Sequence, residues 1–529
     1  MIKIRRMGLI VIFFLILFIS IFTSFQLPNL ENKIYMSIPY NVVDTNTYFS
    51  FMQQAKEGHL LFTNKYTSEN VPYVIFSPVY LILGWFTLFL SPVLAYYLFK
   101  FIFLILFVYL VYRLLKLAVK ETEFDVSSFF VLFGSGIGYI FILLSNLGLK
   151  RYGSADYWIS ETNSVALNIA PVHFVISICL MILIVIFYFK FWENRKLKYL
   201  FLASLFSLTL GFIHLFDLIT LIAAFSIYML WRIAKGKDRF IHILKYNLLY
   251  GIPLAIPFVY TYSLYALNPF FKAWNEQNFL PTPELKQVIF GFFFPLMFAM
   301  IYFAHKFYKK QKFNAFEALL FGWVFSGFAL LYSPFNIQLR FIEGLYIPIM
   351  ILGSLGFLRV ILPSITSPFK IKNIKAISIF MVFVLISPTS FYWLYKINAE
   401  VTPNVKIDDY TIPYFLDKSE LEAMQWLEAN TNRKDVVLSS YGVGNYIPRI
   451  SGNKVFLGHW AQTIDFQDKK ALAAKFFSTN GDDFRKDLIK SYGIGYVYYG
   501  IEERKLGSLN PDYMQKVFEN EKVMIFKYG

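Results

Sequence analysis

Cysteine is nearly absent from this chain of 529 residues. The single one, Cys179, lies inside an apolar stretch, which excludes an intramolecular disulfide and a cysteine-based metal site. Charged residues are also scarce at 16%, whereas hydrophobic residues make up 57% of the chain. Soluble domains hold about 45–50% apolar residues. The composition therefore predicts a polytopic α-helical membrane protein rather than a soluble enzyme.

Acidic residues are fewer than basic ones, which gives the chain a net charge of +16. Most of the Lys and Arg side chains fall in short links between apolar stretches. Such placement is typical of charges that orient membrane helices, and it differs from a basic face that binds nucleic acid. We expect membrane lipid, and no nucleic acid, among the partners.

The N-terminus reads "MIKIRRMGLIVIFFLILFISIFTSF". Its basic head is followed by about 19 apolar residues, which is long for the core of a signal peptide. No clear small-x-small cleavage site follows. We therefore expect a retained first helix with a cytoplasmic N-terminus.

Apolar stretches of about 20 residues, each long enough to cross about 30 Å of hydrocarbon, recur along the chain. One further apolar stretch, 73–90, is shorter and carries Pro78 and Gly84. The longer stretches predict about 11 transmembrane helices, near residues 8–26, 92–115, 127–147, 169–192, 199–213, 216–232, 246–266, 286–305, 313–332, 343–362 and 376–396.

The distribution of basic residues decides whether 73–90 crosses the membrane. If it does not cross, roughly 23 Lys and Arg lie in cytoplasmic segments, against roughly 8 in the outer loops. If it crossed, every later loop would invert and the bias would be reversed. We therefore predict a juxtamembrane helix at 73–90 on the outer leaflet, and an extracytoplasmic C-terminus.

Residues 398–529 are more polar and contain turn signals. The stretches "DVVLSS", "KVFLG", "GYVYYG" and "VMIFKYG" predict strands. "SELEAMQWLEANT" and "DKKALAAKFFST" predict helices, the first with Ser419 as its cap and Glu422 completing a capping box. We predict a membrane module at 1–397, with a first outer loop at 28–91, and a small extracytoplasmic α/β domain at 398–529.

Polar residues that interrupt the apolar pattern gather, in this topology, at the outer face. A shared cavity open to the outer leaflet would explain that placement, since ionisable residues at membrane depth usually face such a cavity. The sequence leaves open whether "GHWAQT", residues 458–463, reaches it. The candidates are Asp44, Tyr48, Asp156, Glu161, His173, His214, Asp217, Lys272, Gln338, Arg340 and Glu343.

Most of these residues also have a purely structural interpretation. The alternatives are an N-cap role for Asp44 before a helix at 45–57 that ends at Gly58, a buried pair for His214 and Asp217, an interfacial aromatic anchor beside Asp156, a helix-start ion pair for Arg340 and Glu343, and a solvated cap for His173.

Three outer segments carry a resemblance. The first outer loop has an acid followed by "TYFSFMQQAKEGHLLFTNKYT" and the Pro-containing "FSPVYLILGWF"; the second has "ADYWISETNSVALNIAPVHF"; a late loop has "FNIQLRFIEGLYIP". Over most of residues 1–400 this layout resembles the GT-C glycosyltransferases, and in particular their protein-mannosyltransferase and aminoarabinose-transferase-like branch.

The resemblance implies a polytopic enzyme that uses a polyprenyl-phosphate-linked sugar. It implies that Asp44 is the catalytic base, that Asp156 or Glu161 is a second acid, and that Arg340 contacts the lipid phosphate. The acid-x-acid pattern of some metal-dependent relatives is missing, because Thr45 and Asn46 follow Asp44. We assign no metal ligands and no certain cofactor, and leave a divalent cation as an open question.

The chemistry of these residues is consistent with such a reaction. Nucleotide sugars are cytoplasmic, so an outward-facing site should use a donor carried on lipid. Arg340 or Lys272 can bind the phosphate that leaves, and Asp44 can accept the proton of an attacking hydroxyl, which predicts inversion at the anomeric carbon. Tyr48, His173, His214, Asp217, Gln338 and Glu343 are expected to line the cavity.

Two other functional classes remain. A transporter or flippase of a lipid-linked or glycan substrate would show broken helices at the midplane and internal repeats, and the sequence shows no repeat. A non-catalytic scaffold would use Asp44 only as a cap. For the transferase, the sugar is open and the acceptor is a protein, lipid or glycan. The expected location is a prokaryotic plasma membrane.

Overall fold

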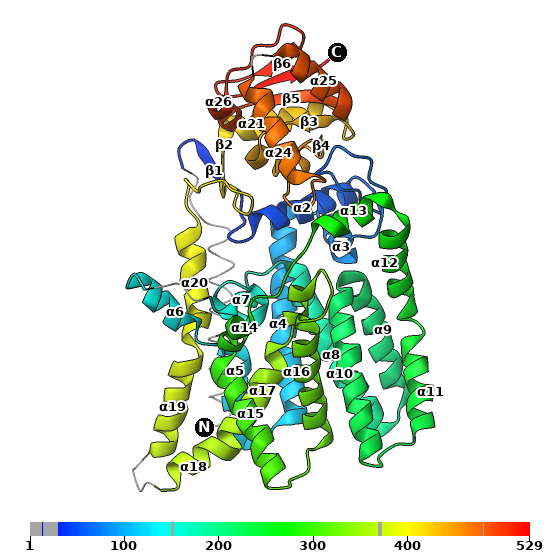
Figure 1. Ribbon diagram of the computed structural model, residues 1–529, viewed down its shortest axis with the longest axis vertical. Coiled ribbons are helices and arrows are strands. Elements are labelled where there is room, and N and C mark those ends of the chain that lie inside the picture. The colour runs from blue at the N-terminus through cyan, green and yellow to red at the C-terminus, as the bar shows by residue number, and fades with distance from the viewer. Residues whose placement is uncertain (1–12, 14–29, 150–152, 369–372, 480) are drawn as a thin grey trace. The chain divides into compact units, whose positions relative to one another are not determined.

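The computed structural model describes residues 13, 30–149, 153–368, 373–479 and 481–529 (Figure 1). The predicted helix at 8–26 lies outside these residues except for Phe13. The chain divides into two compact units. The first comprises Met1–Ile21, Leu98–Ser263 and Phe279–Ile397, and the second comprises Phe22–Tyr97, Leu264–Asn278 and Asn398–Gly529.

Long apolar helices dominate the first unit. Within the described residues, four helical runs have the length and hydropathy to cross a membrane, because an apolar helix of about 20 residues spans about 30 Å. The chain is therefore a multi-pass membrane protein. These runs are α4 Pro92–Ala118, which begins in the second unit, α8 Val172–Asn194, α10 Leu215–Ala234, and Gln338–Thr366, which joins η4 Gln338–Ile342, α17 Tyr346–Gly356, η5 Phe357–Ile361 and α18 Leu362–Thr366.

Four further predicted spans are pairs of helices that meet at a bend. Each pair passes the same test as one broken span, and such bends usually fall at Pro or Gly. The pairs are α5 Phe124–Phe133 with α6 Gly138–Asn146 (48°), α11 Phe240–Gly251 with α12 Ala255–Leu267 (58°), α14 Leu285–Gly291 with α15 Phe293–Tyr308 (89°), and α19 Ile374–Ile386 with α20 Pro388–Glu400 (41°).

The remaining helices of the first unit are shorter. Two of them fall on predicted spans at 199–213 and 313–332, each with 17 residues. They are α9 Leu197–Ile213 and α16 Ala315–Leu331; the others are η1 Glu121–Glu123, η2 Ala155–Tyr157, η3 Ser160–Thr162 and α7 Ser164–Leu167.

Close helix contacts form the core of the first unit. Helix α8 packs on α9, α10 on α16, and α15 on α17, and Figure 1 shows these pairs lying next to one another. Gly353 of α17 makes one contact possible, because a Cβ there would lie 2.5 Å from the carbonyl oxygen of Pro295 in α15. Small residues that let backbones approach are typical of membrane helix packing.

The stretch 73–90 forms only one short helix, α3 Pro78–Phe86. Nine residues rise about 14 Å at 1.5 Å per residue, about half of the hydrocarbon thickness. This segment therefore does not form a spanning helix. Its position on the outer leaflet stays a prediction.

The second unit holds all the strands of the described residues, including the small α/β tail. Strands β3, β4 and β5 are parallel, and β7 pairs antiparallel with β5 and β6, in the order β4-β3-β5-β7-β6. The strands are β3 Val436–Leu438, β4 Lys454–Val455, β5 Ile494–Tyr499, β6 Gln515–Glu519 and β7 Met524–Lys527, with a separate ribbon of β1 Lys33–Tyr35 and β2 Phe415–Asp417.

Helices accompany these strands. Helix α21 packs against β6, and α25 packs against β5. The helices are α2 Val42–Lys56, α13 Pro269–Gln277, α21 Lys418–Asn430, α22 Tyr441–Gly444, α23 Ile447–Ile450, α24 Phe466–Ser478, α25 Asp482–Tyr492 and α26 Ile501–Leu506.

Two predicted helix caps are wrong. The cap of α2 is Asn41, whose side-chain oxygen accepts from the Asp44 N–H, so Asp44 lies within the first turn. Asn41 rather than Asp44 is the N-cap because the helix begins directly after Asn41, which adopts the left-handed conformation with φ 50°. The cap of α21 is Asp417 rather than Ser419, with Glu420 in its capping box, because β2 ends at Asp417 and the helix follows at once.

Helix α2 is fixed by close packing against α3. A Cβ at Gly84 would overlap the Ala55 Cβ and lie 2.7 Å from the Met52 carbonyl oxygen. The rings of Tyr48 and Tyr80 stack at 4.6 Å across the same pair of helices. Glycine at position 84 therefore sets the distance between α3 and the helix that carries Asp44.

We predict that Gly84→Ala destabilises the protein by about 1–3 kcal/mol, because the neighbouring backbone has to move to admit the methyl group. The midpoint of thermal unfolding in detergent measures this. Gly251→Ala in α11 is the control, since its Cβ would meet nothing within 4 Å. Equal midpoints for the two variants would contradict the close α2–α3 packing.

Candidate functional site

A turn in the C-terminal tail, residues 458–463, is tied to two segments distant in sequence. The Thr463 hydroxyl donates to the carbonyl oxygen of Tyr66 at 2.7 Å, and the Asn64 amide donates to that of Gln462 at 2.7 Å. The Asn278 amide donates to the carbonyl oxygen of Ala461 at 2.9 Å. Asn64 and Tyr66, from the segment between α2 and α3, and Asn278, at the end of α13, therefore hold this turn.

The turn places His459 against Asp44. The distance from His459 Nε2 to Asp44 Oδ1 is 2.6 Å, and Asn41 Nδ2 donates to the other oxygen of Asp44 at 2.7 Å. His459 Nδ1 accepts the N–H of Ala461 at 3.0 Å. A neutral imidazole that accepts at Nδ1 carries its proton on Nε2. His459 therefore donates to Asp44, and a donor holds each carboxylate oxygen.

Burial differs between the two partners. The His459 side chain is 3% exposed, whereas that of Asp44 is 28% exposed. A carboxylate oxygen has two lone pairs, so an oxygen that accepts one bond can accept another. The buried histidine fixes the orientation of a carboxylate that other molecules can still reach.

A second group of predicted residues lies together in the first unit. Arg340 of η4 pairs with Glu161 of η3 at 3.4 Å, and its guanidinium lies 5.4 Å from the centre of the Phe174 ring. The Phe174 ring in turn packs on His214, with centroids 5.0 Å apart. Two loops and the break between α9 and α10 therefore meet around one arginine.

His214 occupies that break, with extended backbone between the two helices. Its Nδ1 lies 3.1 Å from Asp217 Oδ2 and 3.1 Å from Glu343 Oε2. The predicted buried pair is thus present, with Glu343 as a third member. His173 lies edge-on to His214 at 4.9 Å and is only 7% exposed, so its alternative as a solvated cap is wrong.

Asp156 lies apart from this cluster and is fully buried. Its Oδ2 accepts the N–H groups of Gly136 and Gly138 at 2.9 and 3.3 Å, and its Oδ1 accepts from the Ser154 hydroxyl. Burial raises the pKa of Asp156 to about 6, although these hydrogen bonds and one with Thr389 oppose the rise. Asp156 therefore holds the bend between α5 and α6.

The other candidates have different surroundings. Gln338 accepts the N–H of Thr282 at 3.4 Å in the first unit. In the second unit, Tyr48 stacks on Tyr80, and Lys272 is exposed on α13. His459, one of six histidines, was not among the predicted site residues. Its only sequence signal is the motif "GHWAQT" directly after a predicted strand.

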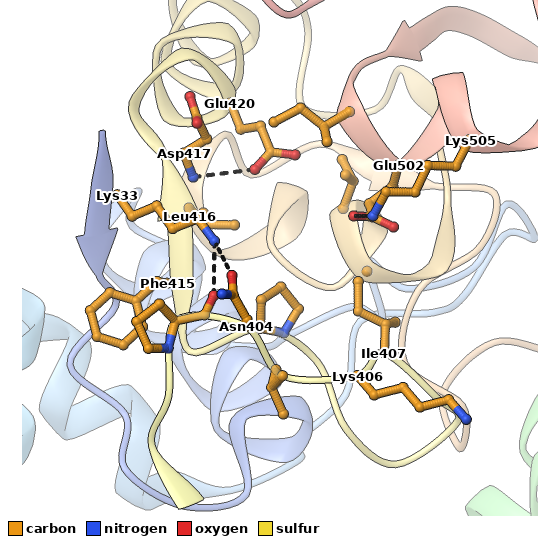
Figure 2. A pocket seen from close by; sticks show the side chains of 16 residues that line it. Lys33, Asn404, Lys406, Ile407, Phe415, Leu416, Asp417, Glu420, Glu502 and Lys505 are labelled. Atoms are coloured by element: carbon orange, nitrogen blue, oxygen red, sulfur yellow. Dashed lines mark hydrogen bonds and ion pairs between the residues drawn. The ribbon is translucent and has the colours of Figure 1, made fainter. Parts of the chain in front are cut away.

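The second unit also contains a cavity of about 400 Å³ (Figure 2). Its lining carries both signs of charge, and Figure 2 shows Lys33 bonded to the segment beside it, where it donates to Pro403 O and Asn404 Oδ1, both at 2.9 Å. Lys505 pairs with Glu502 at 2.6 Å. The residues that line this cavity include neither Asp44 nor His459, so it is separate from their cluster.

Comparison with solved structures finds similarity to the Archaeoglobus fulgidus oligosaccharyltransferase in three crystal structures. With a tethered acceptor peptide the TM-score is 0.49 at 15% identity, over 94% of this chain and 69% of that one. In the apo form it is 0.47 at 14%, over 94% and 69%. In the complex with Zn and sulfate it is 0.46 at 15%, over 93% and 67%. No family model and no curated protein sequence matches the chain.

We predict that Asp156→Asn changes how stability depends on pH. In the wild type the folded state holds the Asp156 proton up to about pH 6, whereas an unfolded chain releases it near pH 4. Unfolding free energy from this group therefore falls as pH rises between these values, by up to about 3 kcal/mol. Asparagine stays neutral and keeps the polar contacts.

Thermal midpoints of both proteins at pH 4 to 7.5 test this. The midpoint of the variant minus that of the wild type should increase from pH 4 to 6 and then stay constant. A difference that is the same at every pH would show that Asp156 does not titrate in this range.

Proposed function

We propose that this protein is a glycosyltransferase of the GT-C type, which moves a sugar from a polyprenyl-phosphate donor to an acceptor hydroxyl at the outer membrane face. The observation that carries the proposal is the Asp44 carboxylate, which His459 and Asn41 orient and which stays 28% exposed. The multi-pass helices and the sequence resemblance support it.

Asp44 has the role of general base in this reaction. The acceptor hydroxyl oxygen forms a bond to the anomeric carbon while the bond from that carbon to the phosphate oxygen breaks. The hydroxyl proton passes to Asp44, and the polyprenyl phosphate leaves with the bonding electrons. A single displacement of this kind inverts the anomeric carbon, and a positioned base accelerates it by about 10²–10⁴-fold.

His459 has a positioning role. Its neutral ring donates one hydrogen bond to Asp44 and does not take the substrate proton, because its second nitrogen already accepts from Ala461. Holding the carboxylate in one rotamer keeps the base in line with the hydroxyl before reaction. The turn 458–463 of the tail thus contributes to the chemistry.

Arg340 binds the phosphate of the donor in this proposal. A guanidinium presents a planar fork that matches two phosphate oxygens, and it stabilises charge that develops on the leaving group. Glu161, at 3.4 Å, orients it. We assign the second acid to Glu161 rather than Asp156, whose oxygens accept hydrogen bonds that fasten the fold. Lys272 is exposed and supplies a second cation.

The finer expectations from the sequence belong to the same proposal. They are the protein-mannosyltransferase-like branch, a protein, lipid or glycan acceptor, a cytoplasmic N-terminus with the tail outside, a prokaryotic plasma membrane, a domain boundary at 397/398, and a substrate cavity lined by Tyr48, His173, His214, Asp217, Gln338 and Glu343.

A transporter or flippase is the second candidate. The four bent helix pairs favour it, because broken helices at membrane depth are common in transporters. The oriented and partly exposed Asp44 favours the transferase, since transport does not require a hydroxyl to be deprotonated.

We predict that Asp44→Asn lowers kcat by about 10²–10⁴-fold with little change in donor KM, because the amide cannot accept the substrate proton. Transfer from radiolabelled polyprenyl-phosphate sugars by purified protein measures this. Asp487→Asn, at an exposed position on α25, is the control. Full activity of Asp44→Asn would rule out the base assignment, and no transfer by wild type with any donor would favour the transporter.

We predict that His459→Gln retains most of the activity, whereas His459→Ala loses about tenfold or more in kcat, because only Gln can still donate to Asp44. The pH profile of kcat distinguishes positioning from proton transfer. The fall of kcat at low pH, where Asp44 becomes protonated, is expected to persist in His459→Gln. Equal losses in the two variants would contradict the positioning role.

A further inference from the structure

At the break between α9 and α10, His214 lies close to two other buried side chains of types that bind metals. His214 is 6% exposed, Asp217 0% and Glu343 1%. Each offers one ligand atom, and these atoms lie within 4.8 Å of one another. Among the described residues, no other group of three His, Cys, Asp or Glu side chains has this geometry.

Two of the three distances between the ligand atoms are close to those around one tetrahedral ion. Zinc binds imidazole nitrogen and carboxylate oxygen at about 2.0–2.2 Å, so two ligands at a tetrahedral angle lie about 3.3–3.4 Å apart. The Nδ1 of His214 lies 3.1 Å from Asp217 Oδ2 and 3.1 Å from Glu343 Oε2. A bound ion would require only small movements of these side chains.

The carboxylates have unused hydrogen-bonding capacity. Asp217 Oδ1 and Glu343 Oε1 are buried and have no hydrogen-bond partner among the described residues. A buried polar atom without a partner costs about 1–3 kcal/mol, and more for a charged group. A bound cation satisfies such a pair of carboxyl groups, and a proton shared between them is the alternative.

The three side chains are of ligand types that one divalent ion binds together. Imidazole nitrogen and carboxylate oxygen are both ligands of zinc, and such an ion would bind the two buried carboxyl groups and accept the lone pair of His214 Nδ1.

We propose that His214, Asp217 and Glu343 bind a divalent transition-metal ion, with zinc as the best match to one imidazole and two carboxylates. The ion joins the turn between α9 and α10 to the segment three residues after Arg340. Its role is structural: it fixes the loop that carries Arg340. This inference does not depend on the glycosyltransferase proposal, which expects these three residues beside the substrate cavity but assigns no chemical step to them.

Metal analysis of the full-length protein in detergent tests the site. We expect about one equivalent of zinc per chain by mass spectrometry after purification without chelator. Removal by chelator should lower the thermal midpoint, and ZnCl2 should restore it. Asp217→Asn and Glu343→Gln keep size and polarity but weaken ligation, so each should lose most of the metal.

Asp156→Asn is the matched control, because that acid is also buried in the first unit but is fully used in hydrogen bonds to the chain. It should retain the zinc. Cobalt added to the chelated protein gives a second readout, with a visible tetrahedral absorption expected in wild type and missing in Asp217→Asn.

Two results would overturn the proposal. One is a wild-type protein without stoichiometric metal whose midpoint responds to neither chelator nor ZnCl2; this would indicate a carboxyl pair that shares a proton. The other is equal metal content in wild type and in the double variant of Asp217→Asn and Glu343→Gln, which would identify an adventitious ion only.

Discussion

The hydrogen bond from His459 to Asp44 is the interaction on which the proposed chemistry depends. It joins residues 415 positions apart, and the turn 458–463 that carries His459 is bonded to Asn64, Tyr66 and the end of α13. Hydrogen bonds to an ionised carboxylate are roughly twice as strong as neutral ones. A single contact therefore links the placement of the tail to the orientation of an acid at the start of α2.

Much of the secondary structure could be predicted because its signals are local. Apolar runs indicated the positions of the helices and bent pairs. The stretch "DVVLSS" contains β3, and "GYVYYG" overlaps all of β5 except its first residue. The prediction of helix caps was wrong where two residues that can cap a helix lie close together in the sequence. Asn41 and Asp44 both have the right side chain, and so do Asp417 and Ser419, but backbone conformation and the end of β2 decide between them. Neither factor is visible in residue type.

The candidate site could be predicted only in part, because its contacts are long-range. Glu161 and Asp156 occur five residues apart in one loop, with equal chemistry. In the fold they differ, because Asp156 is buried and accepts hydrogen bonds from the amides of Gly136 and Gly138. His459 was missed because no local pattern pairs a turn in the tail with the first outer loop. Arg340, His214 and the four predicted residues around them, Glu161, His173, Asp217 and Glu343, share one property in sequence: each interrupts an apolar pattern.

Two charge clusters of the first unit show how a network whose charges are all paired differs from one that retains unpaired oxygens. Arg359 pairs with both oxygens of Glu123 at 2.7 and 2.8 Å and with Glu317 at 3.2 Å, and Lys306 also bonds Glu317. Two cations meet two carboxylates, and the Tyr302 hydroxyl donates to Glu317 as well. In the His214 cluster two carboxylates meet one imidazole and retain oxygens without partners. Because buried polar groups need hydrogen-bond partners, the chain alone satisfies the first cluster. The His214 cluster requires a ligand or a proton from outside it.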